Sequence, residues 1–302
     1  MGDIIRIGTR GSPLALIQAN MVKDRLAAAH GLAGEIVIIK TTGDMVQDRA
    51  LAEIGGKALW TKELDRALRA GEIDCAVHSM KDVETIRPDA IIIAAMLPRA
   101  DVRDRLIGAD SIAALLQGAV VGTSSPRRAA QLCRLRPDVK PVLFRGNVDT
   151  RLAKLAAGEV DATLLAAAGL DRLGRGDIGT AIESDVMLPA PAQGAVGIEA
   201  RTDDARVRGW LAAIDDGATH RCVLLERALL AALAADCHSP VAALAREEGE
   251  RVTIRAELLT EDGSEHVAGT RSGAVGDFGV AEALAADLLS RASPAVRRLF
   301  AA

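Results

Sequence analysis

The chain of 302 residues is poor in aromatic side chains, which make up 2% of it and include no tyrosine. Modules that bind single-stranded nucleic acid stack the bases on aromatic rings, so this scarcity argues against such a platform. No apolar run approaches the length of a membrane span. The first residues, Met-Gly-Asp-Ile-Ile-Arg, lead directly into an expected strand without the pattern of a secretory signal peptide.

Cysteine is also scarce, and the net charge of −4 leaves no strong excess of either sign. Cys75, Cys133, Cys222 and Cys237 lack paired metal-ligand spacing, which favours free thiols in a reducing cytoplasm. A zinc site with His220 and His238 is conceivable. However, His220 and Cys222 are two residues apart on an expected helix and point to different faces. We therefore expect no metal site.

Short apolar strands alternate with helical segments through the first two thirds of the chain, which predicts an α/β fold with mainly parallel sheets. After about Asp215 the pattern changes to one helix, three strands and a closing helix, typical of a small α+β domain. The expected strands are Ile4–Ile7, Glu35–Lys40, Ile73–His78, Ile91–Ala95, Ala119–Gly122, Val142–Arg145, Ala162–Leu165, Ala195–Glu199, Val241–Ala245, Val252–Leu259 and Glu265–Ser272. The expected helices are Pro13–Ala29, Ala58–Ala70, Ser111–Leu116, Pro126–Leu135, Val148–Ala157, Thr219–Leu233 and Val280–Arg291.

The stretch from Thr123 to Lys154 is rich in positive charge, because it contains eight basic residues and only two aspartates. The stretch begins with a strand and a small-residue loop, Ala119-Val-Val-Gly-Thr-Ser-Ser-Pro126. Ser125 can cap a helix that Pro126 starts, so the free backbone amides and the positive helix end face an anion. Arg127 and Arg128 add forked donors suited to carboxylate or phosphate. The pattern indicates a site for a small polyanion.

The same arrangement occurs near the N-terminus, in Ile5-Arg-Ile-Gly-Thr-Arg-Gly-Ser-Pro13. Here Ser12 is the expected cap and Arg10 lies in the loop beside it. Two such units suggest two similar lobes facing one ligand, although two ordinary capped helices with surface arginines would give the same pattern.

Two further segments carry reactive groups. In Asp74-Cys-Ala-Val-His-Ser-Met-Lys-Asp-Val83, an expected buried strand ends at polar side chains, where α/β proteins bind ligands. Lys81 would keep Asp82 ionised, and an ionised carboxylate can stabilise a developing cation and relay protons. A solvated ion pair in a turn is the alternative, and we expect His78 to be a hydrogen-bonded core residue. In Ala234-Ala-Asp-Cys-His-Ser-Pro240, Cys237 lies in a loop, either as an accessible thiol or as an inert one.

The stretch Thr41 to Lys57 is rich in glycine and charge and has no convincing period. A loop of this length inside a compact domain is often a lid or disordered, and we expect a lid over the site.

Six blocks of this sequence, taken together and in order, resemble the porphobilinogen deaminase (hydroxymethylbilane synthase) family. They are Arg6-Ile-Gly-Thr-Arg-Gly-Ser-Pro-Leu-Ala-Leu, Gly55-Gly-Lys-Ala-Leu-Trp-Thr-Lys-Glu-Leu, Ala76-Val-His-Ser-Met-Lys-Asp-Val, Gly122-Thr-Ser-Ser-Pro-Arg-Arg, Arg145-Gly-Asn-Val-Asp-Thr-Arg-Leu and Gln193-Gly-Ala-Val-Gly-Ile-Glu. The resemblance runs from Arg6 to about Glu199 and resumes at Cys237.

The resemblance implies a fold of three domains, the first two similar to periplasmic binding proteins and the third a small α+β domain. We expect them at residues 1–98 with 195–214, 99–194 and 215–302. It also implies an enzyme that joins four porphobilinogen molecules head to tail with loss of ammonia, giving hydroxymethylbilane in tetrapyrrole biosynthesis. The family's dipyrromethane cofactor is attached by a thioether, which would fall here on Cys237.

By position, the family pattern makes Asp82 the principal catalyst, beside the positive nitrogen of the deaminated pyrrole. The same pattern assigns ligand-binding roles, mostly to carboxylates of the cofactor and the growing chain. The expected cofactor-binding residues are Ser79, Lys81, Thr123, Ser124, Ser125, Arg127, Arg128 and Gly146, with Cys237 as the covalent anchor. The expected substrate-binding residues are Arg10, Ser12, Arg145, Arg151, Arg172 and Gln193.

The chain departs from the family pattern at a few positions. Pro126 stands where leucine is common, and Glu53 where lysine is frequent. Before the anchor cysteine, Ala235 replaces a common glycine, which raises the question of a positive φ there. Asp236 would oppose thiolate formation if its charge faces the sulfur.

Two other classes of protein compete with this interpretation. A two-lobed binding protein for small anions would share the twin helix starts but would need neither Cys237 nor the Lys81–Asp82 step. A nucleic-acid module would use the arginines and weaken steeply with salt. We rank both below the enzyme, and expect a monomer that binds a small molecule and neither nucleic acid nor membrane.

Overall fold

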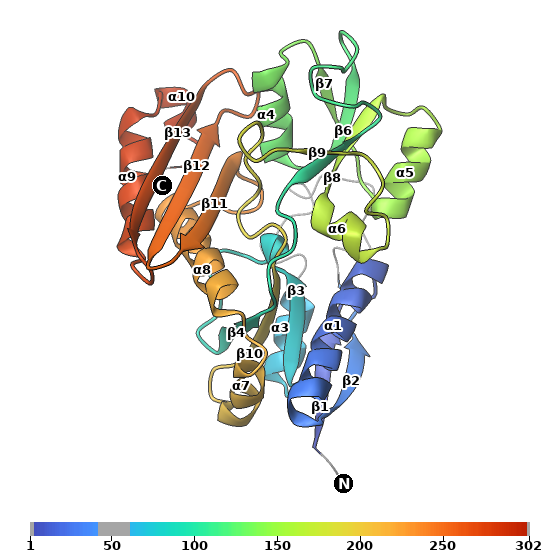
Figure 1. Cartoon of the computed structure of the whole chain (residues 1–302), viewed down its shortest axis with the longest axis vertical. Helices are drawn as coiled ribbons and strands as arrows, with labels where there is room; N and C mark the ends of the chain where they lie inside the picture. The colour runs from blue at the N-terminus through green and yellow to red at the C-terminus, as the bar shows by residue number, and fades with distance from the viewer. Residues whose placement is uncertain (1–2, 42–60, 301–302) are drawn as a thin grey trace. The chain divides into compact units, whose positions relative to one another are not determined.

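The computed structural model describes residues 3–41 and 61–300 (Figure 1). The chain forms two compact units, Met1–Ala100 with Gly194–His220 and Asp101–Gln193 with Arg221–Ala302. The chain therefore passes between the units three times. Each unit is described by itself.

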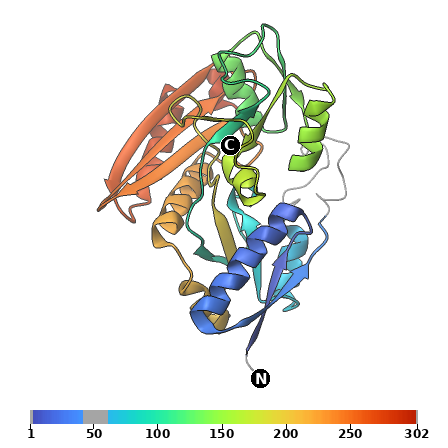
Figure 2. The same cartoon turned by 45° about the vertical axis from the view of Figure 1, so that its right-hand side comes forward.

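The first unit is built on a five-stranded sheet of order β2-β1-β3-β10-β4. Its strands pair in parallel except β10, which is antiparallel to both neighbours. Helix α1 packs against β1, β2 and β3, and Figure 2 shows it lying along the sheet. The strands are β1 (Ile4–Thr9), β2 (Ala33–Ile38), β3 (Cys75–Ser79), β4 (Ile91–Met96) and β10 (Val196–Arg201). The helices are α1 (Pro13–His30), α3 (Lys62–Arg69), α7 (Ala205–Ala212) and the short 3₁₀ turn η2 (Met80–Asp82).

The second unit contains a five-stranded sheet of order β7-β6-β8-β5-β9, in which β5 alone runs against its neighbours. Its strands are β5 (Asp104–Ile107), β6 (Val120–Thr123), β7 (Lys140–Leu143), β8 (Ala162–Ala166) and β9 (Thr180–Ile182). Its helices are α4 (Pro126–Leu135), α5 (Val148–Ala156) and α6 (Ala167–Arg172).

The two sheets have the same plan. In the first sheet, β1 lies between β2 and β3, and the antiparallel strand β10 separates β3 from β4. In the second sheet, β6 lies between β7 and β8, and the antiparallel strand β5 separates β8 from β9. Strand β1 with α1 therefore corresponds to β6 with α4. This confirms the expected α/β class, the mainly parallel sheets and the equivalence of the two Ser-Pro helix starts.

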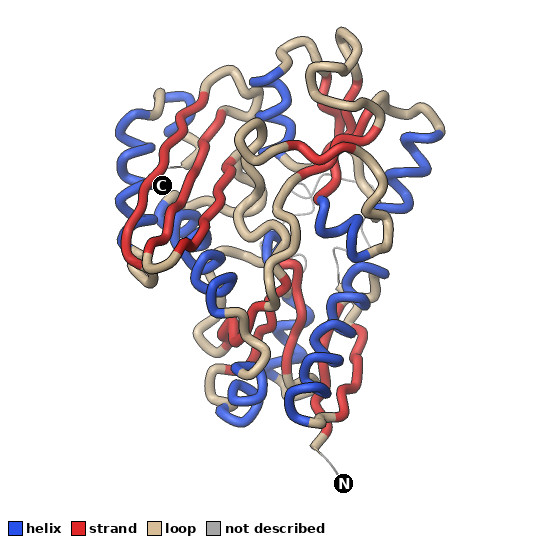
Figure 3. Tube along the Cα trace, viewed as in Figure 1, coloured by secondary structure: helices blue, strands red, loops and turns tan. Residues whose placement is uncertain are grey.

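The second unit also holds an antiparallel three-stranded sheet, β11 (Val241–Glu248), β12 (Arg251–Leu259) and β13 (His266–Ala274). Figure 3 shows the three strands side by side with helix beside them. Side chains of α8 (Gly217–Ala232) and α9 (Gly279–Arg291) share one apolar core with this sheet, and α10 (Pro294–Arg297) adds Val296. The expected α+β arrangement is confirmed, whereas the three domain boundaries stay a prediction. Among the helices within residues 3–41 and 61–300, none is long and apolar enough to cross a membrane.

The structure differs from the sequence prediction in a few places. Residues 111–116 form turns rather than a helix. Strands β5 and β9 were missed because they are short and carry polar side chains, and helices α6 and α7 because they span six and eight residues. Of the expected lid, everything after Thr41 lies outside the described residues, as does Glu53.

Candidate functional site

Both expected helix caps are present. The Ser12 Oγ accepts a hydrogen bond from the Ala15 N–H at 3.3 Å, and Pro13 opens α1. The Ser125 Oγ accepts from the Arg128 N–H at 3.4 Å, and Pro126 opens α4. Each cap follows a parallel strand, so the positive end of each helix lies at the carboxyl edge of its sheet.

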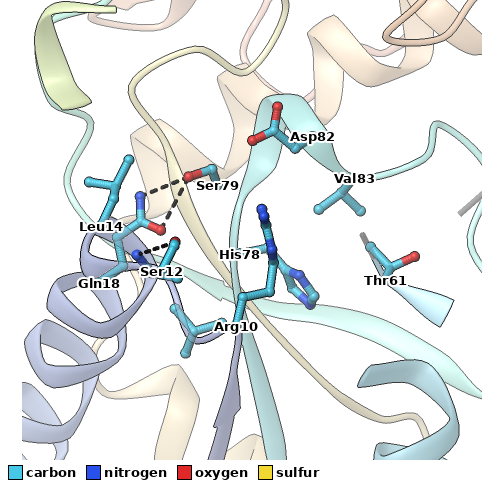
Figure 4. Close-up of a pocket in the computed structure, with 11 residues that line it drawn as sticks. Arg10, Ser12, Leu14, Gln18, Thr61, His78, Ser79, Asp82 and Val83 are labelled. Carbon is cyan, nitrogen blue, oxygen red and sulfur yellow. Dashed lines mark hydrogen bonds between the residues drawn. The ribbon is translucent and has the colours of Figure 1, made fainter. Parts of the chain in front are cut away.

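In the first unit, Asp82 and Arg10 line the same cavity, whose volume is about 70 Å³. Arg10 comes from the loop after β1 and Asp82 from the turn after β3, two adjacent parallel strands. Figure 4 shows both side chains at this cavity with Ser12, Gln18, His78 and Ser79. The structure thus brings together the expected catalytic carboxylate and three of the expected ligand-binding residues, Arg10, Ser12 and Ser79.

The Asp82 carboxylate forms no hydrogen bond or ion pair with any residue in the described ranges. Asp82 is half-buried. Lys81, which follows Met80 in the same turn, is also half-buried and engaged in an interaction of its own. A carboxylate without a protein partner, at the wall of a cavity, is available to a ligand.

Ser79, expected to bind the cofactor, pairs with Gln18 of α1. The Gln18 Nε2 donates to the Ser79 Oγ at 2.8 Å, and the hydroxyl lies 3.1 Å from the Gln18 Oε1. Gln18 is buried, although the sequence analysis did not assign it a function. Its polar group on the buried side of an amphipathic helix was the signal that could have found it.

Beneath the cavity lies a buried ionic network that the sequence did not predict. The His78 Nε2 lies 3.1 Å from a Glu199 carboxylate oxygen, and Arg87 donates to both Glu199 oxygens at 2.7 and 2.9 Å. Burial alone would raise the pKa of Glu199, but His78 and Arg87 outweigh it and lower that pKa to about 2. Glu199 is therefore ionised. His78 is a core residue, as expected, but its buried Nε2 meets no hydrogen-bond partner within residues 3–41 and 61–300 despite its short distance to Glu199.

Arg87 also joins Asp65 and Glu84 to the network. Its Nη2 lies 2.5 Å from an Asp65 oxygen and its Nη1 2.7 Å from a Glu84 oxygen. Burial raises the pKa of Asp65 above its usual value, with Arg87 opposing the rise. Nothing in the sequence pattern links Arg87 to Glu199, which lies 112 positions away.

In the second unit, Asp104 is the centre of the arginine site. Arg127 Nη1 donates to one of its oxygens at 2.7 Å, and Arg128 Nη2 donates to the other at 2.6 Å. The Gln193 Nε2 donates to the same carboxylate at 2.9 Å. Burial would raise the pKa of Asp104, but the two guanidinium groups hold it well below its usual range. Asp104 was not among the predicted site residues.

Arg127 and Arg128 are thus buried against a protein carboxylate, with 3% and 5% of their surfaces exposed. Burial lowers the pKa of Arg127, with Asp104 opposing. The buried Arg127 Nε nevertheless lacks a hydrogen-bond partner within residues 3–41 and 61–300. Two guanidinium groups on one carboxylate leave an excess positive charge. Their role in binding ligand carboxylates stays a prediction.

Ser124, Gly146 and Arg151, which were each predicted to bind ligand, contact one another in the structure. The Arg151 Nε donates to the Gly146 carbonyl at 2.9 Å, and its Nη2 donates to the Ser124 hydroxyl at 3.0 Å. Gly146 has φ of 124°, and a Cβ there would lie 2.6 Å from Thr150 Cγ2, so glycine is required. These contacts join the loop after β6 to the start of α5.

The other expected residues of this unit lie near the same loops. Thr123 is buried, and its hydroxyl accepts from the Ser125 N–H at 3.2 Å. Arg145 and Arg172 are half-buried, and each is engaged in an interaction of its own. Burial lowers the pKa of Arg172 from its usual value, although Asp171 opposes the change. The structure does not bring a ligand to any of them, so their binding roles stay predictions.

Cys237 is exposed, is not part of a disulfide and lies in the loop between α8 and β11. The residue with positive φ in this segment is Ala234, at 51°, and not Ala235, which is buried. The Asp236 carboxylate accepts a hydrogen bond from the His238 N–H at 2.8 Å, and the Asp236 N–H donates to Ser239 at 3.1 Å. The carboxylate therefore closes the turn.

Within residues 3–41 and 61–300, no group of three or more histidine, cysteine, aspartate and glutamate side chains could hold a metal ion. His220 instead pairs with Asp215, with 2.9 Å between Nδ1 and the carboxylate oxygen.

Solved structures with a similar fold include periplasmic solute-binding proteins. A methionine binding protein is 13% identical, with a TM-score of 0.45, over 74% of this chain and 93% of its own. An arginine-specific periplasmic binding protein of Salmonella typhimurium is 12% identical, with a TM-score of 0.40, over 72% and 94%. Similarity at this level carries no information on ligands.

Sequence comparison is far more specific. The family model described as "Porphobilinogen deaminase, dipyromethane cofactor binding domain" matches residues 5–209, and the C-terminal domain model of the same family matches residues 220–291. The porphobilinogen deaminase of Sphingopyxis alaskensis is 60% identical, covering 98% of this chain and 96% of its own length. That of Paracoccus denitrificans is 56% identical over 90% and 89%. The chain belongs to the porphobilinogen deaminase family.

Proposed function

We propose that this protein joins four porphobilinogen molecules head to tail, releasing ammonia and giving hydroxymethylbilane for tetrapyrrole biosynthesis. The observation that carries the proposal is the Asp82 carboxylate, which shares a cavity with Arg10 and has no partner in the described part of the chain. The family match over most of the chain supports the same reaction.

Porphobilinogen carries acetate and propionate arms, so the growing product is a polycarboxylate. The chain offers donors for such groups in both units. Arg10 and the start of α1 lie at the Asp82 cavity in the first unit, and Arg151 with Ser124 lies at the start of α5 in the second. Helix starts and arginine forks bind carboxylates well.

The dipyrromethane cofactor named in the family description suits the residues present. Cys237 is an exposed thiol on a loop whose neighbour, Ala235, is fixed in the apolar core. The buried, unpaired Nε of Arg127 and the excess charge around Asp104 suit a ligand carboxylate. Cys237 would hold the cofactor, with Thr123, Ser124, Ser125, Arg128 and Gly146 beside it on the loops of the second unit. When bound, the cofactor supplies the pyrrole carbon to which the first substrate is joined.

Asp82 would act on the substrate. When the bond between the aminomethyl carbon and nitrogen breaks, ammonia leaves and positive charge spreads to the pyrrole nitrogen. A fixed carboxylate beside that nitrogen stabilises the cation, and it can accept the proton that is lost after the new carbon–carbon bond forms. A group without protein partners is free to make this contact.

The finer features remain part of the proposal. The three domains would divide at residues 98/99, 194/195 and 214/215, with the catalytic carboxylate in the first and the anchor cysteine in the third. We place the protein in a reducing cytoplasm, because four cysteines in 302 residues are few for a disulfide framework. We further propose a monomer that binds neither nucleic acid nor membrane.

Intact-mass measurement of the purified protein and its Cys237→Ser variant tests the function. We expect the protein to carry the added mass of two linked pyrroles, the variant to lack it, and porphobilinogen to produce a ladder of heavier species. Cys133→Ser, which alters a half-buried thiol, is the matched control and should keep the added mass. A bare polypeptide mass that stays bare with porphobilinogen would refute the proposed enzyme.

A further inference from the structure

The Asp82 carboxylate sits on a short turn with few backbone contacts. Strand β3 ends at Ser79, and the single 3₁₀ turn η2 carries Met80, Lys81 and Asp82. The Met80 N–H donates to the Ala195 carbonyl at 3.1 Å, and the Val83 N–H donates to the Met80 carbonyl at 3.3 Å. Met80 takes part in both of these hydrogen bonds, so the position of the turn depends on this residue.

The Asp82 carboxylate is not held in place by contacts of its own. It makes no hydrogen bond or ion pair with the residues whose positions are described. A side chain with such a partner would hold its place even if the turn moved slightly. Here, the position of Asp82 follows the backbone of η2, and the packing of Met80 helps to hold that backbone in place.

Met80 is held by packing against the sheet. Its side chain is only 1% exposed. Below it lies Gly197 of β10, which pairs with His78 of β3 on one side and Met96 of β4 on the other. A Cβ on residue 197 would overlap the Met80 Sδ and lie 2.7 Å from the Met80 Cγ. Met80 thus occupies the space that any side chain at position 197 would need.

Backbone conformation does not explain the glycine at 197. Its φ lies outside the left-handed range in which side chains are strained. A Cβ would also approach the Met96 Sδ to 3.4 Å, which is ordinary contact. Glycine is therefore required at position 197 because Met80 occupies the space that a Cβ would need. A close-packed interior leaves little room for the buried Met80 side chain to move away.

We propose that Gly197 and Met80 are positioning residues for Asp82, with the glycine leaving space for the methionine that anchors the catalytic turn. The inference rests on the proposed function, because it assigns these two residues to the placement of the reacting carboxylate. They do not touch the substrate. Arg10 approaches the cavity from the separate loop after β1, so substrate-carboxylate binding there is independent of this anchor.

Gly197→Ala tests the inference by pushing Met80 upward. A misplacement of about 1 Å at a reacting group costs about 100-fold in rate, and we expect a loss of that order in kcat. The KM for porphobilinogen should change by less than about threefold, since an interaction made only in the transition state is lost. Cofactor content by intact mass and the melting temperature report whether the variant is folded and loaded.

Gly209→Ala is the matched control. Gly209 lies in α7 of the same unit, has no heavy atom within 4 Å of an added Cβ and has no positive φ. The same chemical change should leave kcat unchanged there.

Met80→Ala provides the second background. Met80→Ala is expected to lower kcat and to leave KM unchanged. Adding Gly197→Ala to Met80→Ala should lower kcat by less than about threefold more, because the Met80 atoms that would overlap the new Cβ are gone. Parent-like kcat in folded Gly197→Ala or folded Met80→Ala would overturn the inference. An equal factor for Gly197→Ala in both backgrounds would overturn it as well.

Failure of the inference and failure of the proposed function are distinguishable. A parent protein that binds no dipyrromethane and makes no hydroxymethylbilane refutes the function itself. An active parent whose variants behave as the Gly209→Ala control refutes only the positioning roles.

Discussion

Asp104→Asn is the substitution for which the structure predicts the largest effect in the second unit. The Asp104 side chain is fully buried and accepts from Arg127, Arg128 and Gln193. Replacing the carboxylate by an amide leaves two buried guanidinium groups facing one another without their counter-ion. Breaking a buried ion pair in this way costs about 3–5 kcal/mol of unfolding free energy.

The effect should depend on pH in a defined direction. Burial raises the pKa of Asp104, but the two arginines outweigh it and hold the folded-state pKa below the unfolded value of about 4. A depressed carboxyl pKa stabilises the fold above the unfolded pKa, and this contribution is lost as the pH falls toward the folded pKa. The difference between the protein and Asp104→Asn should therefore be full at pH 7 and shrink below about pH 4.

Hydrogen exchange measured by mass spectrometry can test this prediction within the second unit. Peptides from α4 and β8 report the local unfolding free energy around Asp104, and peptides from α1 serve as an internal reference. Asp138→Asn is the control, because Asp138 forms an ion pair with Arg136 at the surface of the same unit. Equal protection of α4 in Asp104→Asn and the parent, or a difference that does not change with pH, would refute the reasoning.

Three further predictions concern the site and its support. Asp82→Asn should abolish most turnover while the cofactor stays bound, measured by product formation and intact mass; near-normal turnover would contradict its role. Arg151→Leu removes the donor to Ser124 and should stall elongation, which would be visible as accumulated masses of intermediates. Arg151→Lys should be less impaired. An unchanged product yield in Arg151→Leu would contradict the prediction. Gln131→Glu sets a second buried carboxylate beside Glu257 and should cost on the order of 1–3 kcal/mol, of which adding Glu257→Gln should restore the part due to repulsion between the two carboxylates; additive losses in urea unfolding would exclude the coupling.

Local signals in the sequence predicted much of the scaffold. The Ser-Pro helix starts gave both caps, because capping depends on residues within one turn. Strands β1, β3 and β8 are mostly apolar, and the structure places all three inside their sheets rather than at an edge. Short strands with charged ends, such as Asp104–Ile107, gave no periodic signal and were missed.

Long-range pairing limited the prediction of the site. The sequence indicated correctly that arginines gather at the start of α4, but it could not show that Asp104 would form ion pairs with Arg127 and Arg128 from a strand that precedes Arg127 by 23 positions. Glu199 and Arg87 pair across 112 positions. Partners of this kind depend on which strands become neighbours in the sheet, and one sequence does not specify that. The question of a positive φ at Ala235 could also not be answered from the sequence; in the structure Ala234 adopts it instead.

The two sheets share one strand order, so the differences between equivalent loops show where the chemistry is encoded. Strand β3 is followed by a turn with Lys81 and Asp82, whereas the equivalent β8 runs directly into α6, where Ala167 is buried. At the helix starts the difference is reversed, because Pro126 is followed by two arginines and Pro13 by Leu14 and Ala15. One copy of the fold therefore carries the carboxylate that is proposed to react, and the other carries the concentrated positive charge. Within the described residues Asp82 forms no ion pair, although Arg10 lines the same cavity, whereas Asp104 pairs with two arginines, so Asp82 is the carboxylate that stays available to a ligand.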